Sequence, residues 1–146
     1  MSSNNNLVSV SDAIIDGFRQ YSAEKSEQIK KETAKIGREI KGEIISNSPV
    51  REVRTPTRQR RAWRRALNPN RQPGAYKAGW TTQKIEQGQR LTVRVYNRTN
   101  YQIAHLLELG HNNRNGTRTQ GKPHIKPAEE HGKQLLDTAI DRIMRE

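Results

Sequence analysis

The sequence predicts an α+β protein, in which a long N-terminal helix and a C-terminal helix pack on a small antiparallel β-sheet. Three patterns carry this prediction. Apolar residues recur at helical spacing over residues 14–44, and they do so again over residues 135–143. Between these stretches, residues 91–95 alternate between apolar and polar side chains, as in a strand with one buried face. A short helix and a long polar loop complete the predicted architecture.

The first helix is expected from about Val10 to Ser46, with Ser9 and Asp12 placed for a capping box at its start. Its apolar residues form one stripe along the helix: Ile14, Phe18, Tyr21, Ile29, Ile36, Ile40 and Ile44. Three glycines each weaken the helix by about 1 kcal/mol relative to alanine: Gly17, Gly37 and Gly42. At 1.5 Å per residue the helix is roughly 50 Å long, more than a small domain spans. We therefore expect one end to project, where it could contact neighbouring subunits.

Two strands are expected next, from Tyr76 to Ile85 and from Arg90 to Asn97. In the second strand three apolar residues share one face: Leu91, Val93 and Val95. The residues between the strands form a hairpin turn, in which Gly88 supplies a positive φ. Trp80 opens the first strand and is expected to anchor the core.

A short buried helix is predicted from Tyr101 to Leu109. Gly110 is expected to stop it in the left-handed αL conformation, and a polar loop follows from His111 to Lys122. The last helix starts with Pro127 in its first position, and Glu129 and Glu130 lie in its first turn. Its apolar face is expected to contain Leu135, Leu136, Ala139, Ile140 and Ile143.

The length of 146 residues suits one domain, expected over residues 9–146 after a disordered tail at 1–8, with an Arg-rich insertion at 51–73. Only 31% of residues are apolar and 5% aromatic, which is a small supply for a core. Part of the chain is therefore expected to be disordered alone or to pack in an assembly. The chain has no cysteine, no apolar run long enough for a transmembrane helix and no secretory signal, so an intracellular product is the default expectation.

The net charge of +12 favours an anionic partner or acidic neighbours in a complex. Residues 51–71 contain eight arginines and one acid, with Trp63 among them. The candidate contact residues there are Arg51, Arg54, Arg58, Arg60, Arg61, Trp63, Arg64, Arg65 and Arg71. Such a cluster can neutralise phosphates and stack on a base. A loop that becomes ordered on assembly and an acidic protein partner are the alternatives, because arginine binds carboxylates as well as phosphates.

The sequence offers little for catalysis. His105, Glu108 and His111 are the only grouping that hints at a metal, but Gly110 interrupts the helix between them and the order is not that of a zinc protease. His111 and His124 are expected to hold the ends of the polar loop together. The sequence contains no nucleophile-elbow motif, phosphate loop or cysteine nucleophile. We therefore expect neither an enzyme nor a cofactor.

Three segments carry a resemblance to a known family. They are PGAYKAGW (residues 73–80), HLLELGH (residues 105–111) and GKPHIKPAEE (residues 121–130), with Arg114 and Gly116 between the last two. In this order and spacing the chain resembles small head–tail joining proteins of long-tailed phages, which include relatives of the lambda minor tail protein Z. The loop residues that carry the resemblance are His105, Glu108, Gly110, His111, Arg114, Gly116, Pro123, His124 and Pro127. The family usually has a more compact segment where this chain has its arginine-rich one.

The resemblance implies a structural protein of the virion neck or tail, assembled in the host cytoplasm as part of a ring. The implied partners are other copies of the chain and neighbouring neck, tail or connector proteins, with non-specific contact to genomic DNA. The alternative is a small basic nucleic-acid-binding protein that uses residues 51–71. No helix-turn-helix spacing, zinc finger or RNA-binding motif supports that alternative.

Overall fold

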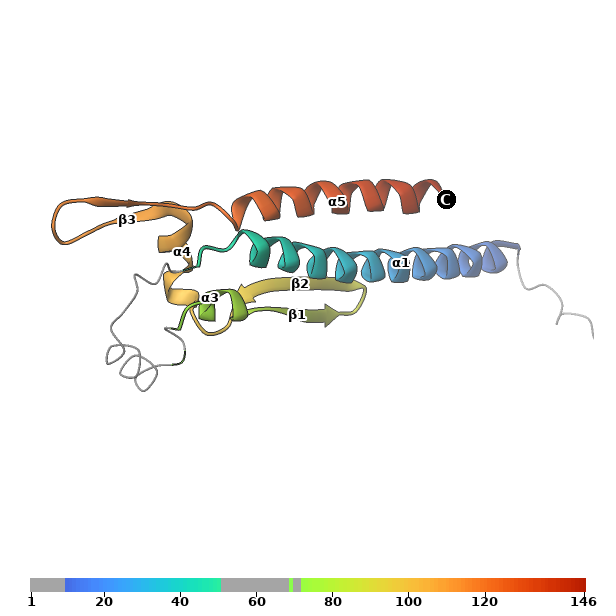
Figure 1. The fold of residues 1–146 in the computed structure, drawn as a ribbon. Coiled ribbons are helices and arrows are strands. Elements are labelled where there is room, and N and C mark those ends of the chain that lie inside the picture. Colours follow the sequence, from blue (N-terminus) through green and yellow to red (C-terminus); the bar gives the residue numbers. More distant parts are fainter. Residues whose placement is uncertain (1–9, 51–68, 70–71) are drawn as a thin grey trace, which may run out of the picture.

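The computed structural model describes residues 10–50, 69 and 72–146, and it confirms the α+β class. Figure 1 shows three layers. Helix α1 (Val10–Asn47) lies in the middle, with helix α5 (Lys126–Arg145) along one side. Strands β1 (Trp80–Gln87) and β2 (Arg90–Asn97) form an antiparallel hairpin along the other side.

Helices α1 and α5 run antiparallel. Gly132, near the start of α5, lies against Ile40, which is in the second half of α1. Near the other end of α5, the Ile143 carbonyl accepts a 2.7 Å hydrogen bond from Lys25 Nζ. The predicted apolar face of α5 is confirmed, because Ala139 and Ile143 are buried.

The core lies where the second half of α1, the start of β1 and the start of α5 meet. Its buried residues are Ile40, Ile44, Tyr76, Trp80 and Ala128. The core is small, as expected from the low apolar content of the chain. Trp80 opens β1 and is buried, as predicted.

The predicted projecting end is confirmed at the N-terminal part of α1. Every residue from 13 to 24 is exposed, including the first three members of the apolar stripe, Ile14, Phe18 and Tyr21. Figure 1 shows this end extending beyond both α5 and the hairpin. The amphipathic stripe therefore has an inner part that packs in the chain and an outer part that is exposed.

The hairpin confirms the predicted second strand and turn, but the prediction for the first strand is wrong at its start. β1 begins at Trp80 instead of Tyr76, because residues Ala75–Ala78 form the one-turn helix α3. Gly74 precedes α3 with φ 82°, and the short helix turns the Tyr76 side chain into the core. Gly88 has φ 59°, as the predicted turn requires.

Helix α4 (Tyr101–Leu109) has the predicted bounds, but the expectation that it is buried is wrong. None of its residues is buried, and Tyr101 and Leu109 are 64% and 70% exposed. Gly110 ends the helix with a positive φ, but the predicted αL conformation is wrong. Its φ of 80° and ψ of 174° lie in a region that is essentially restricted to glycine.

The segment predicted as a polar loop contains a second hairpin, which the sequence analysis did not predict. Strands β3 (Gly110–Asn112) and β4 (Arg118–Gln120) are antiparallel, with Gly110 opposite Gln120. Helix α5 then begins at Lys126, so Pro127 is its second residue instead of its first. Only Glu129 of the two predicted acids lies in the first turn. None of the helices among the described residues is long and apolar enough to cross a membrane.

Candidate assembly site at the junction of α4 and α5

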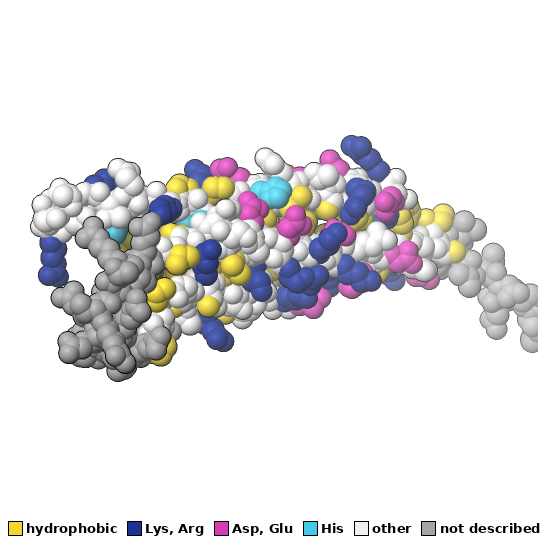
Figure 2. All heavy atoms as spheres, in the orientation of Figure 1, with side chains coloured by type: hydrophobic (Ala, Val, Ile, Leu, Met, Phe, Trp, Pro, Cys, Tyr) yellow, Lys and Arg dark blue, Asp and Glu magenta, His cyan; other side chains and the backbone are white. Residues whose placement is uncertain are grey.

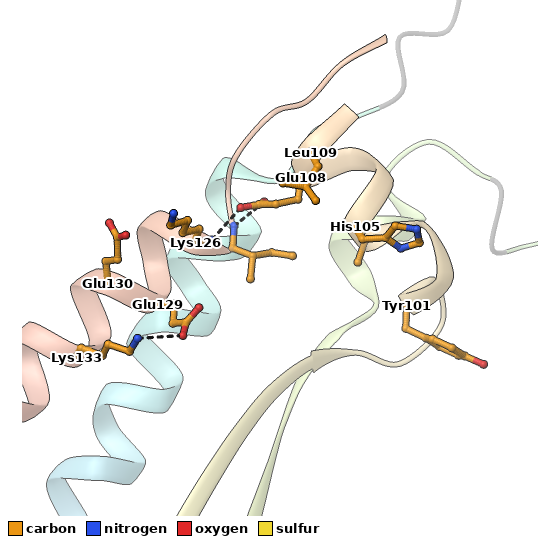
Figure 3. A pocket seen from close by; sticks show the side chains of 10 residues that line it. Tyr101, His105, Glu108, Leu109, Lys126, Glu129, Glu130 and Lys133 are labelled. Atoms are coloured by element: carbon orange, nitrogen blue, oxygen red, sulfur yellow. Dashed lines mark hydrogen bonds and ion pairs between the residues drawn. The ribbon is translucent and has the colours of Figure 1, made fainter. Parts of the chain in front are cut away.

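Glu108, at the end of α4, caps the start of α5. Its Oε2 accepts hydrogen bonds from the backbone N–H groups of His124 (2.8 Å) and Ile125 (2.9 Å), and its Oε1 accepts one from Lys126 (2.9 Å). The N-cap residue of α5 is Ile125, whose side chain cannot accept a hydrogen bond. Figure 3 shows Glu108 extending from α4 to fill this role. A carboxylate from another element therefore satisfies N–H groups that a helix start leaves open.

The geometry also fixes the charge of Glu108. Burial alone would raise the pKa of its carboxyl group, but the hydrogen bonds from the backbone N–H groups of His124, Lys126 and Ile125, together with the nearby His124 ring, outweigh burial. The pKa of Glu108 therefore lies below its ordinary value. A negative carboxylate at the N-terminus of α5 also interacts favourably with the helix dipole.

His124 is the most buried large side chain at the junction, with 1% of its surface exposed. Its Nδ1 lies 2.7 Å from the Lys122 carbonyl oxygen and 3.1 Å from Glu108 Oε2. A carbonyl can only accept, so Nδ1 carries a proton and donates it to this carbonyl, while Nε2 forms a 2.7 Å hydrogen bond with the Tyr76 hydroxyl. Burial and the Glu108 charge raise the pKa of Tyr76 to about 12, so this hydroxyl keeps its proton.

An aromatic group connects this junction to α1. The rings of Tyr76, Trp80 and His124 meet edge to face, with centroids 5.6–6.2 Å apart. The Trp80 indole N–H donates to Ser48 Oγ at 3.1 Å, and this hydroxyl donates to the Ile44 carbonyl at 2.6 Å. The end of α1, α3, β1 and the start of α5 are thereby fixed relative to one another.

Asn97 positions the start of α4. Its side-chain N–H donates to the Tyr76 carbonyl at 2.7 Å, and its Oδ1 accepts from the backbone N–H groups of Thr99 (3.2 Å) and Asn100 (2.8 Å). Gly79 lies directly against this side chain, because a Cβ on Gly79 would overlap Asn97 Oδ1. The second glycine of PGAYKAGW is therefore required for close packing at the junction.

The structure brings some of the predicted loop residues together and separates others. Glu108 and His124 are in contact, and His124 joins the ends of the loop as predicted. His111 lies in β3, and its Nδ1 is buried with no hydrogen-bond partner among residues 10–50, 69 and 72–146. The other predicted loop residues form no hydrogen bond with Glu108 or His124 in the described structure. Arg114 and Gly116 lie at the turn of the second hairpin. His105, Pro123 and Pro127 lie on the exposed surface.

Of the three residues whose spacing hinted at a metal, Glu108 caps α5, His105 is exposed and His111 lies in β3. Among the described residues, no group of three or more His, Asp or Glu side chains could hold a metal ion.

The predicted arginine contacts, together with Trp63, lie outside the described residues. No sequence pattern predicted the roles of Tyr76, Ser48 and Asn97. The only available signal was the presence of Tyr76 in the PGAYKAGW segment, because the partners of all three are distant in sequence.

An open groove lies between α4 and α5 beside the Glu108 cap (Figure 3). Its volume is ≈ 570 Å³. Exposed Tyr101 and Leu109 contribute from α4, and Ile125 contributes at the start of α5. Lys126 and Glu130 are among the charged residues that line it. The junction thus combines a hydrogen-bonded polar interior with apolar side chains exposed at its surface.

Comparison with known families gives a match over most of the chain. Residues 12–110 match the HK97-gp10-like family, described as "Bacteriophage HK97-gp10, putative tail-component". No curated protein and no solved structure matches the chain. The matched region contains nearly all of α1, the first hairpin and α4 with Glu108, and it ends at Gly110. It covers more than half of the 146 residues. The chain therefore belongs to the HK97-gp10-like family of bacteriophage tail components.

Proposed function

We propose that this chain is a structural protein of the phage neck, where several copies form a ring that joins the head to the tail. Its membership of a tail-component family carries the structural role in the virion. The neck position rests on the resemblance of residues 73–80, 105–111 and 121–130 to head–tail joining proteins related to the lambda minor tail protein Z. Its partners would be other copies of the chain and adjacent connector or tail proteins.

The shape of the molecule supports a role in assembly. Its core is small, and large apolar side chains remain exposed on α1 and α4, among them Phe18 and Leu109. Exposed apolar surface of this kind marks sites of protein contact. The Glu108–His124 contact fixes α4 and the second hairpin relative to α5, so these surfaces are held in one orientation. Preorganised surfaces lose less conformational entropy on association.

Removal of the gene from a phage that carries this chain tests the proposal. We expect electron microscopy of the lysate to show DNA-filled heads and separate tails. Heads and tails would each assemble, but they would not be joined to one another. Supplying the wild-type gene in trans should restore joined particles. Complete and infective particles without the gene would contradict the neck role. Heads without any tails would instead indicate a role in building the tail.

A second candidate is a small basic nucleic-acid-binding protein, favoured by the net charge of +12 and the eight arginines of residues 51–71. In a neck ring the same positive charge would contact the genome as it passes through the neck, without any role in sequence recognition. Basic residues that face the passage would contact phosphates without reading sequence. The two candidates differ in stoichiometry: a DNA-binding module acts as a monomer or dimer, and a neck protein acts in a larger assembly.

A further inference from the structure

The turn of the second hairpin contains the only Asn–Gly pair of the chain, Asn115 followed by Gly116. Both residues are exposed, and they lie between β3 and β4, in the hairpin that Figure 1 shows extending beyond α4 at one end of the molecule. Gly116 has φ 80°, and a Cβ at this position would meet nothing within 4 Å. Its backbone nitrogen therefore lies in open surroundings, with no side chain of its own to shield it.

This dipeptide has a chemistry of its own. The backbone nitrogen of the glycine attacks Cγ of the asparagine side chain and gives up its proton to solvent. A bond forms between this nitrogen and Cγ, the bond from Cγ to Nδ2 breaks, and ammonia leaves with a proton from solvent. Water then opens the resulting succinimide ring at one of its two carbonyl groups, which gives aspartate or isoaspartate. A side chain on the following residue hinders the attack, and glycine has none.

The side-chain amide of Asn115 is held in a way that favours this attack. Its Oδ1 accepts hydrogen bonds from the backbone N–H of Thr117 at 3.1 Å and from the Thr117 hydroxyl at 2.6 Å. Two donors at this oxygen stabilise the negative charge that develops on it when Cγ is attacked. The leaving nitrogen, Nδ2, has no hydrogen-bond partner among the described residues.

The two other asparagines of the hairpin are held differently. Asn113 Nδ2 donates to the hydroxyl oxygens of Thr117 at 3.0 Å and Thr119 at 3.1 Å, so its leaving group is tied to the hairpin. Asn112 accepts a 3.2 Å hydrogen bond from Arg118. Each of these two asparagines precedes a residue with a side chain, Asn113 and Arg114 respectively. The structure therefore distinguishes Asn115 from its neighbours by its successor and by its hydrogen bonds.

One contact opposes the reaction. The Gly116 N–H donates to the Asn113 carbonyl at 3.1 Å, and this hydrogen bond must open before the nitrogen can attack. The bond lies in an exposed turn, where hydrogen bonds open at little cost in free energy. The fold therefore slows the reaction without preventing it.

We propose that Asn115 is a site of spontaneous deamidation, which changes the surface of the second hairpin. Residues 110–122 contain three cations and no acid, so the new carboxylate lowers their net charge from three to two; the cations are Arg114, Arg118 and Lys122. Aspartate retains an oxygen that can accept from Thr117. Isoaspartate lengthens the backbone by one methylene group, which disturbs the 2.7 Å hydrogen bond from the Asn113 N–H to the Thr117 carbonyl.

Ageing of the purified full-length chain at neutral pH tests the proposal. Cleavage after Glu108 and Glu129 with a glutamate-specific protease releases one peptide that contains all three asparagines of the hairpin. Fragmentation mass spectrometry then locates the mass gain that follows from replacing NH2 by OH. We expect Asn115 to react about tenfold faster or more than Asn112 and Asn113, since it alone precedes glycine.

Two variants show whether the product arises at this position. Asn115→Gln should abolish the fast mass gain and the labelling of aged protein by an isoaspartyl methyltransferase, because ring closure from glutamine requires a less favourable six-membered ring. Asn112→Gln, the matched control in the same hairpin, should leave both unchanged. Circular dichroism should be the same for both variants, since both side chains are exposed. Equal rates at the three asparagines, or labelling that persists in Asn115→Gln, would overturn the proposal.

Discussion

At the scale of single residues, Glu108 and His124 form a buried polar joint. Glu108 accepts three backbone hydrogen bonds, and the described structure gives each ring nitrogen of His124 a partner. Buried polar groups are stabilising only when they are satisfied in this way. The joint therefore makes the orientation of α4 relative to α5 sensitive to the charge of one carboxylate.

Glu108→Gln should lower the free energy of unfolding at neutral pH by about 1–3 kcal/mol, because one carboxamide oxygen cannot replace two carboxylate oxygens facing three N–H groups. The folded-state pKa of Glu108 is depressed, so its contribution is present above the unfolded-state value near 4.5. The contribution is lost as pH falls through the lower folded-state pKa. Urea denaturation from pH 7 to pH 3 should therefore show a smaller loss of stability in the variant than in the wild type.

Glu130→Gln is the matched control, since Glu130 is exposed in α5, the helix that Glu108 caps, and caps no backbone group in the described structure. It should change stability by less than about 0.5 kcal/mol. A Glu108→Gln protein whose stability falls with acid as steeply as that of the wild type would show that other carboxylates dominate the pH dependence.

At the scale of elements, α1 organises the fold because it contacts the hairpin on one side and α5 on the other. The glycines of α1 differ in how much space a side chain would have, which depends on the side of the helix on which each glycine lies. A Cβ on Gly37 would overlap Val93 Cγ1 of β2, whereas a Cβ on Gly42 would meet nothing within 4 Å. The expectation that glycines only weaken the helix therefore holds for Gly42, but at Gly37 the missing side chain permits close packing.

Alanine at these two positions should have opposite effects. Gly42→Ala should raise the free energy of unfolding by about 0.5–1 kcal/mol, the usual gain in a helix. Gly37→Ala should lower it by roughly 1 kcal/mol, because overpacking costs about 1–3 kcal/mol and exceeds the gain in helix propensity. Chemical denaturation of both variants measures this difference. Stabilisation by both would mean that α1 and β2 separate easily enough to admit the methyl group.

The elements differ in how far the sequence reveals them. Helix α1 and strand β2 were predicted closely, because their periodic patterns extend over many residues. Strands β3 and β4 have only three residues each and almost no apolar content, so no alternation marks them. Helix α4 was predicted as buried because it is apolar, yet it lies at one end of the molecule, where the described residues do not cover it.

The junction was less predictable than the elements that build it. The Tyr76–His124 hydrogen bond joins residues 48 positions apart, and the Trp80–Ser48 bond joins residues 32 apart. No local pattern specifies such pairs. The sequence did single out Glu108 as a charged residue between two histidines and His124 as a residue that holds the loop ends, but it did not give the capping role of Glu108.

At the scale of the whole molecule, the net charge of +12 is distributed unevenly along the sequence. Figure 2 shows Lys and Arg side chains interspersed with acidic ones along the middle of the molecule. On this part of the described surface, basic and acidic side chains therefore lie next to one another. The eight arginines of residues 51–71, with Glu52 as their only acid, are a concentrated positive segment by contrast.

Replacing Arg60, Arg61, Arg64 and Arg65 by Gln tests whether this segment contacts nucleic acid. If each arginine neutralises one phosphate of a short random duplex, the variant should bind more weakly and its log–log salt slope should be shallower by up to about 3.6. Titration at several salt concentrations measures this slope, and circular dichroism should be unchanged.

Changing four exposed arginines of the described surface to Gln gives a control with the same net charge of +8; these are Arg90, Arg94, Arg98 and Arg145. Equal weakening in both variants would assign the binding to overall charge. If the wild type does not bind the duplex, the favoured partner of residues 51–71 becomes an acidic protein surface, because arginine pairs with carboxylates as well as with phosphates.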